Sequence, residues 1–418
     1  MPTPRCLPAI VLLVTAAFSS ECGAQETSGT PAMSMQGLLG PYEVTREASG
    51  TSWQPDSTPM GGVHFMSASW FTMLHGYLDL VYDDQGGPRG ATQTFLTGML
   101  MFMARRELSD GALGARLMVS PDPAMGASGY PLLFQTGETA DGSTPLIDRQ
   151  HPHNLLMEAA LTYSLDLSRV SSLYLYAGPA GEPALGPPAF MHRLSAEDNP
   201  EAPLTHHWLD STHISYGVVT VGYTLGAFKV EASAFNGHEP DQHRWDVELG
   251  ALDSYAARLS FNPTPAWSLQ VSSGHLVSPE QLQPGVNINR TTASASYNAP
   301  LGVWWQTTFA WGHIAPAVGP ATNGWLLESA AQPLPRQTVF GRLERVDKDE
   351  LFLPGEALYG QTFTVNKLTL GYIYDLARWQ SIRFGIGGLV STYWFPSVLD
   401  GSYGSHPNSF MVFVRARL

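Results

Sequence analysis

The stretch SWFTMLHGYLDLVYD, residues 69–83, alternates in polarity at every second position. One face of an extended chain would carry large apolar side chains, at Trp70, Leu74, Leu78, Leu80 and Tyr82. The opposite face would carry a wetter set, at Met73, His75, Tyr77 and Asp79. A period of two predicts a β-strand, because successive side chains of a strand point to opposite sides of its sheet.

The same alternation recurs along the chain, so each such segment has one apolar face and one wetter face. Clear examples are TFLTGMLMFMA (94–104), NKLTLGYIYDL (366–376), SIRFGIGGLVSTYW (381–394) and SFMVFVRARL (409–418). In the last segment the apolar face holds Phe410, Val412, Val414, Ala416 and Leu418. The chain closes on leucine where barrel proteins usually close on an aromatic residue, which departs from the usual signal for the barrel assembly machinery.

The connections between these segments alternate between short and long. We expect short links after Ala104, Leu165, Tyr223, Phe261, Tyr297, Leu327 and Leu376. We expect longer loops after Tyr82, Ser120, Gly178, Asn236, Gly274, Gly312, Val346 and Pro396. The pattern predicts about sixteen strands, with fourteen as the alternative count, and an even number of hairpins of this kind is typical of a bacterial outer-membrane barrel.

The predicted fold class is all-β: a single transmembrane antiparallel β-barrel with short periplasmic turns and long extracellular loops. A sheet that spans a bilayer avoids a lipid-exposed edge only if it closes, and closure leaves one apolar face and one polar face. Aromatic residues near strand ends would form interfacial girdles, at Trp70, Tyr82, Tyr163, Trp267, Trp305, Trp311, Tyr372 and Trp394. The alternative is a soluble sandwich or propeller, because alternation alone does not say which face meets lipid.

The amino terminus has the layout of a cleaved secretory signal peptide, residues 1–24. One arginine precedes an apolar run at 7–18, and small residues follow it. Cys6 and Cys22 both lie in this segment, so the exported chain would have no thiol for a disulfide or a thiolate metal site. We expect export to the outer membrane of a bacterial cell.

The composition limits the classes of partner. A formal net charge of -14 and a charged fraction of 14% exclude nucleic acid, which needs a basic surface. No later stretch reaches the roughly 18 apolar residues of a membrane helix. No linker or change of composition divides the chain, so we expect residues 25–69 as a periplasmic leader or lumen segment and 70–418 as one barrel.

Three histidine-rich stretches fall in the expected long loops: IDRQHPHN (147–154), LTHHWLDSTH (204–213) and NGHEPDQHRWD (236–246). Long loops of such barrels fold inward and constrict the lumen, so their side chains would meet at one rim. Candidate metal ligands there are His151, His153, His192, His206, His207, Asp210 and His213. Candidate constriction residues from the same loops are Asp148, Arg149 and Arg193.

Two interpretations of the histidines remain open. Neutral imidazole suits copper, zinc and similar cations, and carboxylates complete the shell, which predicts copper or another divalent cation as the ligand. The spacing is loose, however, and matches no standard motif. The alternative is that these residues bond to one another and to loop backbone, and hold the loops in shape across a water-filled lumen.

Catalysis is a third interpretation, because Asp210, Ser211 and His213 are the residue types of a serine hydrolase. On an extended strand end Ser211 and His213 would share a face and Asp210 would point away. We therefore expect no enzyme.

Methionine gives a second indication of metal binding, because thioethers are soft ligands that prefer Cu(I). Met33 and Met35 lie one residue apart in the leader, and the alternative is that they are ordinary residues of a flexible segment. For the trio Met99, Met101 and Met103 we expect a lumen-facing position and a role in packing or in lining a pore.

Further charges are expected to face the lumen from the strands, at Glu158, Glu231, Arg342 and Glu344. Opposed acidic and basic residues line many pores and set a transverse field. The alternative is simple solvation of the lumen wall, since a register slip of one residue reverses every assignment.

Four segments carry a resemblance to a known family: GPYEVTREASGTSWQPD (40–56), YPLLFQTGETADGSTPLIDRQHPHN (130–154), GEPALGPPAFMHR (181–193) and DNPEAPLTHHWLDSTHISYG (198–217). They resemble a family of proteobacterial outer-membrane β-barrel proteins associated with copper-resistance gene neighbourhoods. The resemblance covers nearly the whole chain after the signal. It implies the barrel and assigns no functional residue.

We predict a channel or transport component for small solutes or ions. The alternative is a metal-binding outer-membrane protein of copper tolerance that uses the loop histidines, Asp210 and the leader methionines. Expected partners are outer-membrane lipids, the barrel assembly machinery and the small solute or metal ion. A homo-oligomer is expected only by analogy with trimeric sixteen-stranded porins.

Overall fold

The computed structural model describes residues 35–67, 69–300 and 304–418. The expected signal peptide, with both cysteines, and Met33 lie outside the described residues. Among the described residues, no helix is long and apolar enough to cross a membrane.

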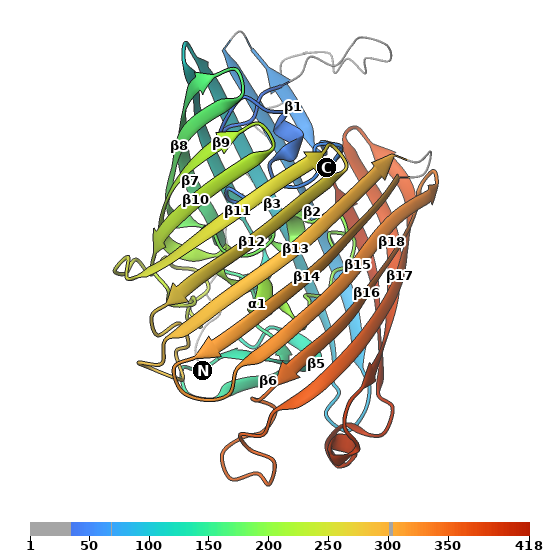
Figure 1. Ribbon diagram of the computed structural model, residues 1–418. Helices are drawn as coiled ribbons and strands as arrows, with labels where there is room; N and C mark the ends of the chain where they lie inside the picture. Colours follow the sequence, from blue (N-terminus) through green and yellow to red (C-terminus); the bar gives the residue numbers. More distant parts are fainter. Residues whose placement is uncertain (1–34, 68, 301–303) are drawn as a thin grey trace, which may run out of the picture. The chain divides into compact units, whose positions relative to one another are not determined.

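The chain forms a closed antiparallel barrel of 16 strands (Figure 1). Consecutive barrel strands pair with one another, and the circle closes where β19 pairs with β2. The strands are β2 (Trp70–Gln85), β3 (Thr92–Leu108), β4 (Gly111–Val119), β7 (Leu156–Ser168), β8 (Ser171–Gly181), β9 (Ser215–Leu225), β10 (Phe228–Phe235), β11 (Ser254–Thr264), β12 (Trp267–Leu276), β13 (Ile288–Pro300), β14 (Trp304–Pro316), β15 (Thr322–Leu334), β16 (Gln337–Lys348), β17 (Phe363–Trp379), β18 (Ile382–Trp394) and β19 (Asn408–Arg417). The predicted fold class and strand count are confirmed.

The expected alternation of short and long connections is also confirmed. One rim has tight links, such as 109–110, 169–170 and 226–227, and the other rim has loops such as 120–155 and 182–214. We call these the short-turn rim and the long-loop rim; the long-loop rim lies at the bottom of Figure 1. By the usual arrangement of such barrels, the short-turn rim would face the periplasm.

The two faces of the wall agree with the predicted strand register. Apolar side chains point outward and remain exposed, as in Leu161 at 63% and Val390 at 61%. Inward neighbours such as Asp79 and Lys367 are fully buried. The expected girdle aromatics are all exposed except Trp311, which is half-buried beside Trp325. An exposed apolar outer face is stable only in contact with lipid, which favours a membrane barrel over a soluble one.

An N-terminal segment, residues 35–62, packs against the inner wall near the short-turn rim. It contains the short helix η1 (Val44–Arg46) and continues into β1 (Val63–Met66), which pairs with the first part of β2. Arg116 on β4 donates to the backbone carbonyls of Ala48 and Gly50. On the far side of the segment, Lys229 donates to the carbonyl of Thr51. Residues 35–62 of the expected leader therefore lie inside the lumen.

Two long loops fill the rest of the lumen. Loop 120–155 contains η2 (Asp122–Met125) and the hairpin of β5 (Tyr130–Thr139) with β6 (Pro145–Gln150), and loop 182–214 contains η3 (Phe190–His192), α1 (His206–Leu209) and η4 (Ser211–His213). Loop 395–407 adds η5 (Ser397–Leu399) and α2 (Asp400–Tyr403).

Loop 182–214 crosses most of the height of the barrel. Its Asp198 accepts hydrogen bonds from Arg415 and Arg417, near the end of β19 at the short-turn rim. The loop returns to the long-loop rim at β9, and nearly all of its residues are buried. Apolar loop residues such as Leu204 and Trp208 form a core with inward wall residues such as Ala310 and Leu326. The expectation of a water-filled lumen is therefore wrong for this part of the barrel.

The four wall charges expected to line a pore do point inward, but they are buried against partners. Glu231 pairs with Arg258 at 2.8 Å, and Arg342 pairs with Glu328 at 3.2 Å. Glu158 accepts from the Tyr176 hydroxyl at 2.8 Å, and Glu344 accepts from Thr205 in loop 182–214. These buried groups hold the wall and the lumen loops together. The expectation that they set an electric field across an open, water-filled pore is therefore corrected.

Candidate functional site: a histidine cluster inside the barrel

The stretch LTHHWLDSTH is helical, not extended. Residues His206–Leu209 form α1 and Ser211–His213 form η4, so His206 and Asp210 lie one turn apart on the same side. The strand geometry expected here is wrong, because a local bond between the side chains of His206 and Asp210 closes the turn. Trp208 anchors this turn to the wall, since its indole nitrogen donates to Thr322 at 3.0 Å.

The wall makes room for this turn with a glycine. A Cβ at Gly312 on β14 would lie 2.2 Å from the backbone oxygen of Trp208, so only glycine allows this close approach. Gly137 does the same for the cluster, because its Cβ would lie 2.5 Å from the His207 ring.

Five histidine rings gather around this turn from two loops. His206 lies 5.6 Å from His207 and 5.2 Å from His213, measured between ring centroids. From the other loop, His153 lies 5.2 Å from His213 and His151 lies 5.5 Å from His207. We call these five residues the histidine cluster: His151, His153, His206, His207 and His213.

Each ring in the histidine cluster turns its Nδ1 atom toward an acceptor. Nδ1 of His213 donates to the Asp210 carbonyl at 2.7 Å, and Nδ1 of His206 donates to the Asp210 carboxylate at 2.8 Å. Nδ1 of His153 donates to Asp122 at 2.7 Å. The two remaining Nδ1 atoms are near glutamates, that of His151 at 3.2 Å from Glu138 and that of His207 at 3.8 Å from Glu239.

The Nε2 atoms of all five rings are buried and have no hydrogen-bond partner among the described residues. A proton held on Nδ1 leaves the lone pair on Nε2. Leaving such an acceptor buried and unpaired costs about 1–3 kcal/mol per group, so five together need an explanation. An imidazole fixed through one nitrogen with its other nitrogen free is the usual arrangement of a histidine metal ligand and its supporting acceptor.

Asp210 connects the histidine cluster to the wall. Its carboxylate also accepts from Arg193 at 2.6 Å, and Arg193 in turn pairs with Glu328 on β15 at 2.6 Å. Burial alone would raise the pKa of Asp210, but Arg193 and His206 hold it below its ordinary value. A carboxylate that stays ionised keeps the imidazole proton on Nδ1 of His206.

Burial lowers the pKa of His151, His207 and His213 well below its usual value. For His206 burial also lowers the pKa, and Asp210 partly offsets this. These imidazoles are therefore neutral at pH 7, which is the form that binds metal.

A close set of ligand atoms adjoins the histidine cluster. One ligand atom each from His207, Glu239 and Glu280 lies within 4.8 Å of the other two. Burial and the neighbouring Glu138 raise the pKa of Glu239 to about 8, and Glu239 itself raises that of Glu280. Crowded carboxylates of this kind are relieved by a cation. No trio from the histidine cluster is as close within the described ranges, so shared coordination by three imidazoles needs the rings to rotate toward one another.

The structure separates the other predicted site residues from the histidine cluster. His192 lies beside Met118 in a different part of the lumen, with Nε2 at 3.2 Å from the Met118 sulfur. Met35 packs against the apolar group that includes Leu38 and Leu39. These residues are therefore not ligands of the same ion as the cluster.

The predicted constriction residues Asp148 and Arg149 lie on β6. Asp148 is buried and pairs with Arg89 at 2.8 Å. Arg149 donates to the backbone oxygens of Ser128 and Gly129. Both hold loop 120–155 in shape.

Sequence reasoning missed the acidic residues that complete the site: Asp122, Glu138, Glu239 and Glu280. Glu239 lies inside the stretch NGHEPDQHRWD, whose histidines and aspartates are the more obvious candidate ligands. Asp122 lies far from any histidine in sequence, and Glu280 lies near only His275, which is not part of the cluster, so no local signal marks them. Asp241, Asp246 and Glu248 form a second close group of carboxylates on the same loop as Glu239, in which Asp246 is exposed and the other two are half-buried.

The residue types of a serine hydrolase do not form a triad here. The Ser211 hydroxyl donates to Glu239 at 3.4 Å, and His213 uses its Nδ1 atom to bind the backbone of Asp210. Among the described residues, no hydrogen bond joins Ser211 to His213.

Two of the hollows in the filled lumen border histidines named above. A small one of about 10 Å³ touches His151, His153 and Phe190. A larger cavity of about 470 Å³ begins at the short-turn rim, beside Arg417. Tyr77 and Met191 line both and separate them.

No protein-family model matches the chain, and no curated protein matches its sequence. Among solved structures, the chain is similar to OprB of Pseudomonas putida, with 8% identity over 84% of this chain and 94% of that chain and a TM-score of 0.51. It is also similar to OmpF of Salmonella typhi in a complex with daunomycin, with 9% identity over 85% and 100% of the two chains and a TM-score of 0.50. At such low identity these likenesses show the fold alone. The chain thus has the closed 16-strand fold of outer-membrane barrels.

Proposed function

We propose that the protein is an outer-membrane transport component that binds a divalent transition-metal cation inside its filled lumen. The observation that carries this proposal is the set of five buried Nε2 atoms without partners, in rings whose Nδ1 atoms face acceptors. The cation enters beside His207, Glu239 and Glu280, whose ligand atoms are already close. Imidazole and carboxylate together suit Zn²⁺, Cu²⁺ and Ni²⁺.

The packed lumen supports a binding component over an open pore. Loop 182–214 crosses the barrel and is tied to the wall by buried ion pairs, among them Lys367 with Glu201 and Arg193 with Glu328. Removing one partner from a buried pair of this kind costs about 3–5 kcal/mol. The loop is therefore part of the resting structure, and passage of an ion requires it to move.

The test is equilibrium binding of Zn²⁺ to the refolded protein in detergent, measured by dialysis and metal analysis. Substitution of His206, His207 and His213 by alanine removes the centre of the cluster, and His238→Ala with His406→Ala removes two exposed histidines as the control. We expect the triple variant to bind at least about 100-fold more weakly and the control to match the wild type. Equal binding by the triple variant would show that the cluster only holds the loops, with water on the Nε2 atoms.

A passive channel for small solutes is the second candidate, favoured by the large cavity that reaches inward from the short-turn rim. Single-channel recording of refolded protein in a planar bilayer separates the two. If the metal-binding proposal is correct, the bilayer shows no conductance steps in metal-free buffer. Discrete conductance steps in metal-free buffer would favour the passive channel.

A further inference from the structure

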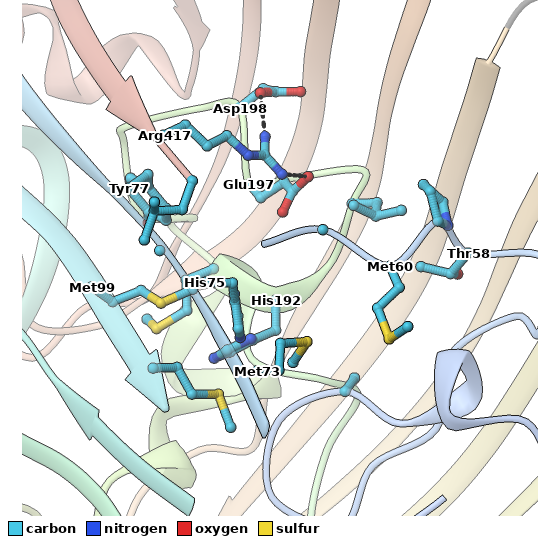
Figure 2. Close-up of a pocket in the computed structure, with 18 of the residues that line it drawn as sticks. Thr58, Met60, Met73, His75, Tyr77, Met99, His192, Glu197, Asp198 and Arg417 are labelled. Atoms are coloured by element: carbon cyan, nitrogen blue, oxygen red, sulfur yellow. Dashed lines mark hydrogen bonds and ion pairs between the residues drawn. The ribbon is translucent and has the colours of Figure 1, made fainter. Parts of the chain in front are cut away.

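The large cavity of about 470 Å³ is lined by sulfur to an unusual degree (Figure 2). Six of the 14 methionines of the chain line it: Met60, Met73, Met99, Met101, Met103 and Met191. They come from three separate parts of the chain: the N-terminal segment, the adjacent strands β2 and β3, and loop 182–214. A single amphipathic stretch therefore does not account for them.

Strand register places one cavity methionine, Met101, in a row with a histidine and a further methionine, Met118. His75 on β2 is the direct partner of Met101 on β3, and Met101 is the direct partner of Met118 on β4. Directly opposed side chains of antiparallel strands lie about 4.5–5.5 Å apart at their Cβ atoms. The row His75, Met101, Met118 thus crosses three strands of the inner wall.

A second histidine covers this row from loop 182–214. Nε2 of His192 lies 3.2 Å from the Met118 sulfur, and the rings of His192 and His75 lie 5.6 Å apart. Figure 2 shows both rings side by side in the cavity, close to the thioethers of Met73 and Met99. The ring nitrogens of His75 make no hydrogen bond with any described residue. Two imidazoles and several thioethers therefore face one space.

Packing accounts for only part of this arrangement, since Met99, Met101, Met118 and Met191 belong to one apolar group of the lumen. Methionine fills irregular gaps in cores, but here its side chains border a hollow that they leave open. Thioether sulfur is a weak hydrogen-bond acceptor, so methionine is a poor choice for solvating a lumen wall. Thioethers are instead good ligands for soft cations.

We propose that this methionine cavity binds a soft monovalent cation such as Cu(I) or Ag(I) through His75, Met101 and His192 of its lining, with the Met118 sulfur behind His192. This site is distinct from the histidine cluster, which lacks sulfur and suits divalent ions. Its rim carries Glu197 and Asp198, both paired with Arg417. The inference rests on its own residues and holds whether or not the histidine cluster binds zinc.

The test uses Ag(I), which needs no reducing agent, and measures its binding to refolded full-length protein by competition titration. Met101→Leu with Met118→Leu removes both sulfurs of the row and keeps side-chain volume nearly constant. Met125→Leu with Met411→Leu is the matched control, because these methionines neither line the cavity nor contact His192. We expect at least about a tenfold loss of silver affinity in the first variant and no change in the control.

X-ray absorption at the silver edge gives a second readout that a folding defect does not imitate. The site predicts sulfur as a silver neighbour in the wild type and its loss in the Met101→Leu, Met118→Leu variant. Unchanged silver affinity in that variant, or nitrogen neighbours alone in the wild type, would overturn the proposal. If the histidine cluster does not bind metal, the result is different: the wild type then lacks zinc binding but still binds silver.

Discussion

In the histidine cluster every ligand atom comes from a loop, whereas in the methionine cavity most ligand atoms come from the neighbouring strands β2, β3 and β4. Loop ligands need outside support to keep their orientation, and the cluster has it, since Asp122 and Asp210 bind its imidazole Nδ1 atoms. Strand ligands are oriented by the sheet itself. One barrel can thus hold two sites of different chemistry. Hydrogen bonds orient the ligands of one site, and strand register orients the ligands of the other.

Replacing loop 182–214 with a short glycine-serine link should have the largest effect, because it changes metal binding at both sites. The change removes three cluster histidines together with Met191 and His192. We expect zinc binding to disappear and silver binding to weaken, because β2 to β4 keep their thioethers. We also expect conductance steps in a planar bilayer, since the loop no longer crosses the lumen.

Folding of this variant is checked by the heat-dependent shift in its gel mobility. If the folded variant shows no conductance in the bilayer, then loop 120–155 and the N-terminal segment close the lumen by themselves.

Asp210→Asn should separate the two sites, because it weakens zinc binding at the histidine cluster and leaves the methionine cavity unchanged. The change removes the charge that holds Arg193 and the imidazole proton of His206. Loss of such a supporting carboxylate costs about 10–100-fold in metal affinity, so we expect zinc binding to fall by that factor and silver binding to stay unchanged. The exposed Asp253→Asn is the control. Equal zinc affinity in both variants would contradict the role of Asp210.

The cluster histidines should add little to the pH dependence of zinc binding. Burial lowers the pKa of His151, His207 and His213, so protons compete for these rings only in more acidic solution. Three imidazoles of ordinary pKa, about 6.5, would together lose about 30-fold in affinity between pH 7 and pH 6. Glu239 titrates in this range, because its pKa is raised to about 8, so we expect a few-fold loss at most in a zinc titration of the Glu239→Gln variant.

The sign of the accompanying stability change follows from linkage. The unfolded chain binds protons on these histidines near pH 6.5 and the folded chain does not, so the free energy of unfolding should fall as the pH drops below that value. A drop of about 30-fold in the zinc affinity of the Glu239→Gln variant between pH 7 and pH 6 would show that the rings are open to water.

Gly312→Ala should have the smallest effect. Its Cβ would lie 2.2 Å from the Trp208 backbone, so the turn that carries His206 and His207 must shift. Overpacking of this kind costs about 1–3 kcal/mol in the free energy of unfolding, measured by urea titration of the refolded barrel. Gly61→Ala is the control, because a Cβ there meets nothing within 4 Å. If both variants unfold at the same urea concentration, the close contact at Gly312 carries no strain.

The sequence predicted the barrel well because the wall is a local property. Alternation in segments such as 69–83 depends only on neighbouring residues, and lipid outside selects for it at every strand. The inward positions of Met99, Met101 and Met103 followed from the same period and are confirmed. The helical turn at His206 was not predicted, because the bond from His206 to Asp210 competes with extension and leaves no periodic signal.

The site was predicted only as a set of residue types. Histidine richness in the loops pointed to His151, His153, His206, His207 and His213, which the structure brings together. It could not separate His192, because the direction in which loop 182–214 crosses the lumen depends on distant pairs such as Arg415 with Asp198. The row of His75, Met101 and Met118 depends on the register between strands, which no single segment reveals.

The most direct test of the account is X-ray absorption at the zinc edge of the refolded protein after loading and desalting. The account predicts retained zinc with several imidazole nitrogens at about 2.0–2.1 Å, together with carboxylate oxygen. It also predicts loss of the imidazole signal when His206, His207 and His213 are changed to alanine. Zinc that washes away, or zinc held by oxygen alone, would contradict the claim that the cluster is a metal site.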